Sequence, residues 1–326
     1  MLIRTLDLND TYSGPRQIGH PSDNIGAALA AAEMADRSGL DLLRALRMGY
    51  EIYGRVLDLS DPDSPWDHVT VSGIVTAAMI GYLLRLPPVR LAHAIALAAS
   101  HSATLGEVRV GHVSAAKSIA NSVVVQTAAL MTLLAAEGVT GPGRGDRGVR
   151  GYARLIMDGA DFSQFFTTGQ DTDRLMAVGL KQYPCFALGQ GPISAAVELR
   201  KRLPAQAEIA KLTIAVANTG AARLRLSDTL RAHAEARRRP PTTASIFLTA
   251  VALLDGRFGL DQLTGGRWQD ADVRALVERT EATIDPAPQA SSIAAVSARS
   301  RADEWRDDRD RAESHARHAG DAAVVG

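Results

Sequence analysis

The first half of the chain is a succession of apolar, alanine-rich segments with helical spacing, and this pattern limits the folds that are open to it. Helices are expected over residues 25–37, 41–56, 71–84, 89–102 and 114–137. These segments are apolar on most faces, which is typical of helices buried among other helices. The sequence therefore predicts an all-helical domain over residues 1–172.

The second half has a different character. The stretch 209–216 has the pattern of a strand, with Leu212, Ile214 and Val216 on one face. Helices are expected on either side of it, over residues 192–202, 245–254 and 270–283. A smaller α+β domain is therefore predicted over residues 173–296, and the chain as a whole is expected to be mainly α.

The end of the chain differs from both. Arg, Asp, Glu and Ala dominate residues 299–317, where Trp305 is the only large apolar side chain. Such a segment buries too little apolar surface to offset the conformational entropy that is lost when a chain becomes ordered. We expect a disordered or aberrant tail over residues 297–326.

The composition excludes several classes of protein. The 36 basic and 36 acidic side chains balance, whereas a nucleic-acid-binding protein is usually basic. The single cysteine, Cys185, rules out a disulfide within the chain and argues against an iron–sulfur cluster held by cysteines. No apolar run reaches the roughly 18–20 residues of a membrane span, and the amino terminus lacks a secretion pattern. We expect a soluble cytoplasmic protein without a nucleic-acid or membrane partner.

Acid–base groups are concentrated near the start of the chain. Residues 4–24 contain Asp7, Thr11 and His20 in a segment punctuated by glycine and proline, which is typical of a loop. Taken alone, Asn9 and Asp10 are better explained as residues that order the loop through side-chain to backbone hydrogen bonds. The nearby His20 shifts the balance, because it precedes a turn and a helix N-terminus, where an anionic substrate is favoured.

Two further clusters carry candidate site residues. His68 follows Trp66 and Asp67 at the start of an apolar helix, where a lone histidine is more often a structural hydrogen-bond partner than a catalyst. Arg109 and Lys117 flank a turn that contains glycine. From the first turn of its helix Lys117 either reaches solvent or faces an anionic site, and the two readings are about equally supported.

The last cluster is Lys181, Tyr183 and Pro184, which either places an ammonium and a phenol over a cleft or forms a turn between domains. The histidines at 68, 93, 101 and 112 match no metal-ligand spacing, so no metal site is predicted.

The four clusters, in this order and spacing, resemble the MmgE/PrpD family, which includes 2-methylcitrate dehydratase and cis-aconitate decarboxylase. The matching patterns are Asp-Leu-Asn-Asp-Thr with Gly-His-Pro-Ser-Asp-Asn, then Trp-Asp-His, Arg-x-Gly-x-x-Ser-x-x-Lys and Lys-x-Tyr-Pro. The resemblance implies a helical domain, a smaller α+β lid domain and a homodimer. It also implies which positions are catalytic, namely Asp7, Thr11, His20, His68 and Lys117. The positions that it implies for substrate binding are Arg109, Lys181 and Tyr183.

The expected function is that of a cofactor-independent hydro-lyase that dehydrates a small tricarboxylate such as 2-methylcitrate, in propionate catabolism. Fixed cations would meet the negative charge that develops when a proton is removed next to a carboxylate. A decarboxylase or isomerase of the same family is the alternative, although Phe247 and Leu248 stand where the family has a tyrosine in the lid. Relative to the family the chain also looks shortened at both ends, so an inactive remnant acting at most as an interaction protein is the third reading.

Overall fold

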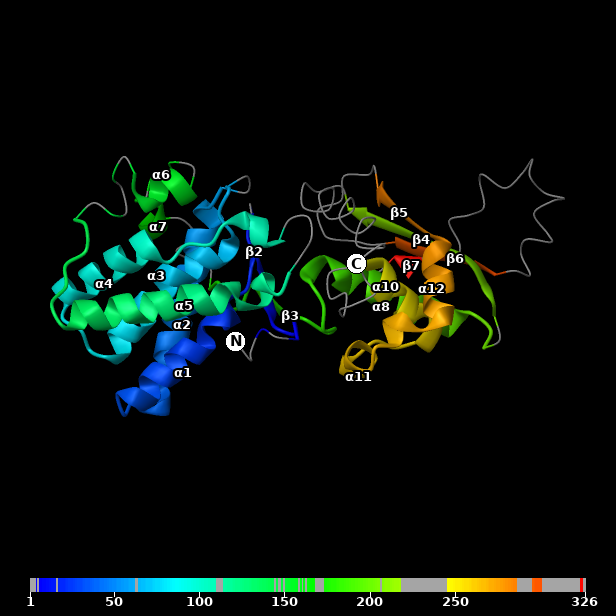
Figure 1. Cartoon of the computed structure of the whole chain (residues 1–326), viewed down its shortest axis with the longest axis horizontal. Helices are drawn as coiled ribbons and strands as arrows, with labels where there is room; N and C mark the ends of the chain where they lie inside the picture. The colour runs from blue at the N-terminus through cyan, green and yellow to red at the C-terminus, as the bar shows by residue number, and fades with distance from the viewer. Residues whose placement is uncertain are drawn as a thin grey trace. The chain divides into compact units, whose positions relative to one another are not determined.

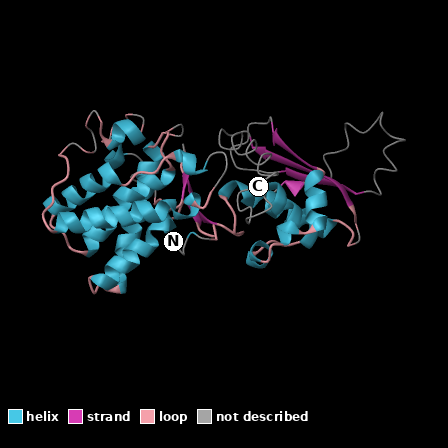
Figure 2. Ribbon diagram, viewed as in Figure 1, coloured by secondary structure: helices cyan, strands magenta, loops and turns pink. Residues whose placement is uncertain are grey.

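The computed structural model resolves the chain into two compact units. Its described residues are 4, 6–15, 17–61, 64–109, 114–143, 145, 148, 150–157, 159, 161, 163–167, 173–205, 207–217, 245–285, 295–300 and 323–324. The first unit comprises Met1–Thr5 and Asn9–Leu180, and the second comprises Leu6–Leu8 and Lys181–Gly326 (Figure 1). The predicted fold class is confirmed: the chain is mainly helical, with a small sheet in the second unit (Figure 2).

The first unit is built around one central helix. Helix α3 (Val71–Leu83) is buried along nearly its whole length, which explains why its sequence is apolar on every face. It contacts four neighbouring helices in the first unit. These are α1 (Ile25–Met34), α2 (Gly39–Leu59), α4 (Pro88–His101) and α5 (Ala116–Ala136), followed in the chain by the short α6 (Tyr152–Ile156) and α7 (Gln164–Thr167).

Helix α2 begins earlier than the sequence pattern predicted. The helix was expected to begin at residue 41, but its N-cap is Ser38, whose hydroxyl accepts a hydrogen bond from the Asp41 backbone N–H at 3.2 Å. The Asp41 carboxylate in turn accepts one from the Ser38 backbone N–H at 3.3 Å. This reciprocal capping box satisfies two amide groups that an uncapped helix leaves without partners, so the helix starts at Gly39, two residues before Asp41.

Part of the segment that was expected to be a loop forms a small antiparallel sheet in the first unit, with strand order β2-β1-β3. Strand β1 (Asp10–Ser13) pairs with β2 (Ile18–Gly19) through a tight turn, with Tyr12 opposite Gly19. Its other edge pairs with β3 (Val178–Leu180). Because β3 lies at the far end of this unit's sequence, local patterns give no sign of the pairing.

The second unit packs helices against a four-stranded sheet of order β5-β4-β6-β7. Strand β4 (Ile209–Ala217) pairs in parallel with β5 (Thr280–Asp285) and antiparallel with β6 (Ala295–Ser300). Strand β6 in turn pairs antiparallel with β7 (Ala323–Val324). The helices are α8 (Gln190–Arg202), α10 (Ser245–Asp255), α11 (Leu260–Thr264) and α12 (Ala271–Glu278). Apolar side chains of α8, α10 and α12 share one buried cluster with Leu212 and Ile214 of β4.

Two segments of the second unit differ from the expectation. The helix expected over residues 270–283 ends at Glu278, and residues 280–285 form β5 instead, because they pair with residues 212–217 of β4. Residues 297–300, which were assigned to the tail, belong to β6, where Ser297 lies opposite Thr213. Residues 301–322 of the expected tail lie outside the described residues.

Among the described residues, one helix is long and apolar enough to cross a membrane by length and composition. This helix is α5, so the expectation that no apolar run reaches such a length is wrong. A core helix of a soluble protein meets the same criteria. One face of α5 is buried within the first unit and packs Ala120 and Val124 against Val69.

Candidate active site

Strand β1 is fixed to α2 by two side chains that point to the same face. Asp10 and Tyr12 are buried, whereas Thr11 between them lies on the opposite face of the strand. The Tyr12 hydroxyl donates to the Asp58 carboxylate at 2.9 Å, and Asp10 is hydrogen-bonded to Tyr50. Burial, followed by the hydrogen bond to Asp58, raises the pKa of Tyr12 to about 12. The Thr11 hydroxyl oxygen is buried and has no hydrogen-bond partner among the described residues.

The Asp10 carboxylate connects β1 to the start of the next helical turn. It accepts hydrogen bonds from the Ser22 hydroxyl at 2.6 Å and from the Ser22 backbone N–H at 3.1 Å. Ser22 belongs to the 3-10 turn η2 (Pro21–Asn24), which leads directly into α1. Burial raises the pKa of Asp10, and the hydrogen bonds from Ser22 and Tyr50 oppose that effect.

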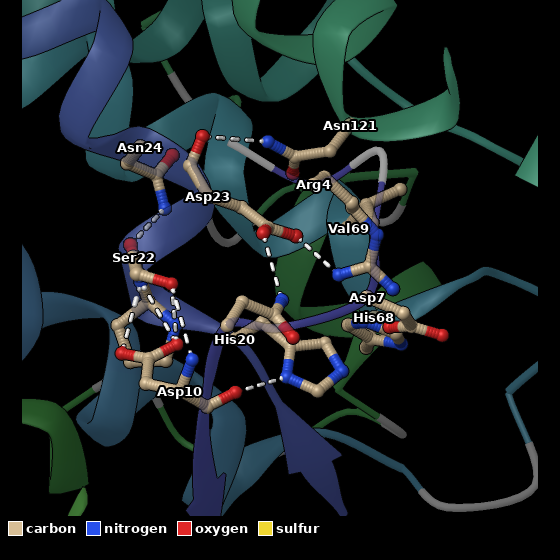
Figure 3. A network of polar contacts seen from close by, with 12 residues as sticks. Arg4, Asp7, Asp10, His20, Ser22, Asp23, Asn24, His68, Val69 and Asn121 are labelled. Carbon is tan, nitrogen blue, oxygen red and sulfur yellow. Dashed lines mark hydrogen bonds and ion pairs between the residues drawn. The ribbon is translucent and has the colours of Figure 1, made fainter. Parts of the chain in front are cut away.

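His20 is held between β1 and α2. Its backbone N–H donates to the Tyr53 hydroxyl at 3.1 Å, and its Nδ1 lies 2.6 Å from the main-chain oxygen of Asp10. Since a carbonyl oxygen only accepts, Nδ1 carries the proton, and in the neutral ring Nε2 is the basic nitrogen. The His20 ring meets the His68 ring edge to face, with centroids 5.4 Å apart, so two of the predicted catalytic residues lie side by side (Figure 3).

His68 opens the 3-10 turn η3 (His68–Thr70), which Asp67 caps by accepting from the Val69 backbone N–H at 3.0 Å. The Asp67 carboxylate also takes the Arg109 guanidinium in a forked ion pair, with one N–O distance of 3.1 Å. The His68 Nδ1 lies 3.5 Å from the same carboxylate. Arg109 and His68 are therefore connected through Asp67, and both the arginine and the aspartate are largely buried.

Lys117 lies in the first turn of α5, and only 8% of its surface is exposed. The Ser114 hydroxyl accepts from the Ala116 backbone N–H at 3.2 Å, just where the helix begins. An ammonium group at the positive end of a helix dipole is unfavourable there without a nearby anion.

Three of the predicted site residues belong to the second unit. The Lys181 ammonium group donates to both the carboxylate and the main-chain oxygen of Asp7, each at 3.0 Å. Asp7 has a positive φ of 54°, a left-handed conformation that an aspartate adopts more readily than most residues. Tyr183 packs in the apolar core with Cys185 and Phe186, and its backbone N–H donates to Gln190 at 3.0 Å.

A buried polar network that sequence reasoning missed surrounds the start of α1 (Figure 3). The Asp23 carboxylate pairs with the Arg4 guanidinium at 2.5 Å and accepts from the Asn9 amide at 3.0 Å. Asn121 donates to the main-chain oxygen of Asp23 at 3.0 Å. Asn121 is four residues after Lys117, so helical spacing in α5 gave the one available signal for its position.

The second missed group is an ion-pair network that fixes the segment before β3. Arg174 pairs with Glu51 and Asp58 of α2, each at 3.0 Å, and is almost fully buried. The same Asp58 holds Tyr12 of β1. A side chain at Gly54 would collide with Arg174, since a Cβ there would lie 2.4 Å from its side chain.

Within the described residues no three histidine, cysteine, aspartate or glutamate side chains cluster as metal ligands, and His112 lies outside that part.

The comparisons with known proteins cover both units. The profile of the MmgE/PrpD N-terminal domain matches residues 1–164, and that of the MmgE/PrpD C-terminal domain matches residues 183–323. The chain is 29% identical over 309 residues to a 2-methylcitrate dehydratase of Cupriavidus necator and 27% identical over 304 residues to one of Escherichia coli. Each alignment covers 88% of this chain, and the chain spans 61% of the length of both relatives. A 2-methylcitrate dehydratase-like protein, oryR of Aspergillus oryzae, is 34% identical over 99 residues, which are 26% of this chain and 20% of that protein.

Proposed function

This chain belongs to the MmgE/PrpD family, and we propose that it is a cofactor-independent hydro-lyase that dehydrates a small tricarboxylate such as 2-methylcitrate. It would act as a cytoplasmic homodimer in propionate catabolism. The names of the relatives from Cupriavidus necator and Escherichia coli support this substrate class. The observation that carries the proposal is the edge-to-face contact of His20 and His68, with the His20 proton fixed on Nδ1.

Dehydration of a hydroxy acid needs a base and an acid close together. The base removes a proton from the carbon next to a carboxylate, the carbon–oxygen bond breaks, and the leaving hydroxyl takes a proton and departs as water. His20 presents a basic Nε2 because its Nδ1 donates to Asp10. We assign the base to His20 and the proton donor to His68, since two adjacent imidazoles can divide these roles. The Thr11 hydroxyl has no hydrogen-bond partner among the described residues. We assign it to orient the substrate by a hydrogen bond.

The intermediate carries additional negative charge, and Lys117 is assigned to stabilise it. A fixed cation in a site from which water is largely excluded stabilises developing charge more strongly than it does in bulk water. Arg109 is assigned to a substrate carboxylate, because its contacts with Asp67 leave further guanidinium N–H donors. Lys181 and Tyr183 are assigned to substrate binding, with Asp7 as the acid–base group that Lys181 orients.

The alternative is a decarboxylase or isomerase of the same family. Phe247 and Leu248 are buried in α10, where the family has a tyrosine, so a phenol is not supplied from these two positions. The loss of a hydroxyl removes one proton donor and leaves the two-histidine arrangement unchanged. We therefore place dehydration first.

The test is turnover by the purified chain. The rise in absorbance of an unsaturated product is followed with 2-methylcitrate and with citrate, carbon dioxide release is measured in parallel, and light scattering gives the oligomeric state. Unsaturated product without carbon dioxide supports the hydro-lyase, whereas carbon dioxide release supports the decarboxylase. The proposal would be contradicted by a folded protein that forms no unsaturated product, releases no carbon dioxide and binds neither acid in a calorimeter.

A further inference from the structure

Asn121 has one half of its amide paired and the other half unused. Its Nδ2 donates to the main-chain oxygen of Asp23 at 3.0 Å, and only 4% of the residue is exposed (Figure 3). Its Oδ1 is buried and has no hydrogen-bond partner among the described residues. A buried acceptor without a partner is unfavourable, so a ligand that donates a hydrogen bond to it would be favoured.

The orientation of the amide is fixed by its partner. The main-chain oxygen of Asp23 only accepts hydrogen bonds, so the edge of the Asn121 amide that faces it must be the NH₂ group. A flipped amide would bring two carbonyl oxygens together. The Oδ1 of Asn121 is therefore directed away from Asp23. As an amide oxygen, it can only accept a hydrogen bond, and the donor must come from another group.

The position of Asn121 links it to the candidate site. Lys117 and Asn121 are four residues apart in α5, so both project from the same buried face, with about 5–6 Å between their Cβ atoms. This face packs through Ala120 and Val124 against Val69, the neighbour of His68. Asp23, which holds the other half of the amide, is three residues after His20. The unused acceptor thus lies one helical turn from the buried cation and beside the turns that carry both histidines.

We infer that Asn121 binds the hydroxyl group of the substrate, with its Oδ1 accepting the hydrogen bond from the substrate O–H. This inference rests on the proposed function and adds a specificity-determining residue to it. A hydroxy tricarboxylate carries a hydroxyl donor for Asn121 as well as carboxylates that suit a site next to the buried cation Lys117. The unsaturated product has no such hydroxyl, so Asn121 distinguishes the substrate from the product.

The inference is tested with two acids that differ by a single hydroxyl group. Citrate and tricarballylate both carry three carboxylates, and only citrate has the hydroxyl. Their dissociation constants are measured by calorimetry on the full chain. The wild-type protein is expected to bind citrate about tenfold more tightly than tricarballylate, as one buried hydrogen bond allows. In Asn121→Ala this preference falls to about one, while the affinity for tricarballylate changes little.

Controls separate this role from damage to the helix. Thr132→Val removes a hydroxyl from the same buried face of α5, where Thr132 bonds only within its own helix, and should leave the preference at its wild-type value. Asn121→Leu, which keeps the branched shape of the side chain, replaces the alanine variant should that one not fold. Because the preference is a ratio within one protein, partial loss of folded protein does not change it.

The outcomes are distinct. A lost preference in the Asn121 variants, with an intact preference in Thr132→Val, supports the inference. A preference that survives Asn121→Ala and Asn121→Leu overturns the inference and leaves the proposed function standing. A wild-type protein that binds neither acid overturns both.

Discussion

The Nδ1 of His20 lies 2.6 Å from the main-chain oxygen of Asp10. The side chain of the same Asp10 holds Ser22, two residues after the histidine. One aspartate therefore fixes both the ring of His20 and the turn that follows it. The hydroxyl of Tyr53 meets the His20 backbone, and a Cβ at Gly19 would lie 2.5 Å from that hydroxyl, so glycine is needed there for the close approach.

Lys117→Ala should abolish turnover of the proposed substrate and leave the fold intact. The substitution removes the cation assigned to the developing negative charge, and alanine is well tolerated at the start of a helix. Steady-state kinetics and circular dichroism are the measurements. A folded variant with wild-type-like activity would contradict the assignment, and Lys201→Ala, an exposed lysine at the end of α8, is the matched control.

His20→Gln should lower kcat by about 10²–10⁴-fold, the usual contribution of a general base. Glutamine has no basic nitrogen, although its amide can donate to the Asp10 carbonyl. The thermal midpoint should change much less than the rate. His93→Gln serves as the control, because His93 lies in α4 and its ring accepts from the Gly141 backbone N–H. Equal losses of rate in both variants would show that the effect is structural.

Asp10→Asn should change how stability depends on pH. Burial raises the folded-state pKa of Asp10 above its ordinary value of 3.8, so the folded protein holds this proton more tightly than the unfolded chain does. The stabilisation is complete below the unfolded pKa and is lost as the pH rises through the folded pKa. The asparagine variant lacks this loss and should gain stability relative to the wild type as the pH rises above the unfolded-state pKa of about 3.8. Urea unfolding as the pH is raised is the measurement, and a constant difference between the two proteins would contradict the prediction.

Arg174→Met should destabilise the first unit by about 3 kcal/mol, because Asp58 then keeps a largely buried charge without this partner, whereas Glu51 still pairs with Arg55. The double variant Arg174→Met with Asp58→Leu should recover part of that loss, since it removes the carboxylate that lost its arginine partner. Chemical denaturation of the two variants provides the comparison. If the double variant is less stable than the single variant, then losing the hydrogen bond from Tyr12 to Asp58 costs more stability than leaving the Asp58 carboxylate without Arg174.

The helices could be predicted from the sequence because their signals are local. The apolar spacing of α3 and the proline that opens α4 lie within the elements they define, and both helices begin within one residue of the expected position. The strand pattern of β4 was equally local. Strand β5 was mistaken for the end of a helix, because residues 280–283 continue the amphipathic pattern of α12 and only pairing with β4 makes them a strand.

The order of the motifs supplied the candidates for the site, but not how they contact one another. The sequence by itself determined the helical class, the family resemblance and the candidates His20, His68 and Lys117, because residue type and spacing are properties of the chain. Tertiary structure decided that the rings of His20 and His68 meet, and that Asp67 connects Arg109 to His68. It also decided that Asn121 keeps an unused acceptor one helical turn from Lys117. Arg174 and Tyr12 likewise both bind the carboxylate of Asp58. Those contacts join residues far apart in the chain, and burial in the folded unit, which no local pattern encodes, fixes their geometry.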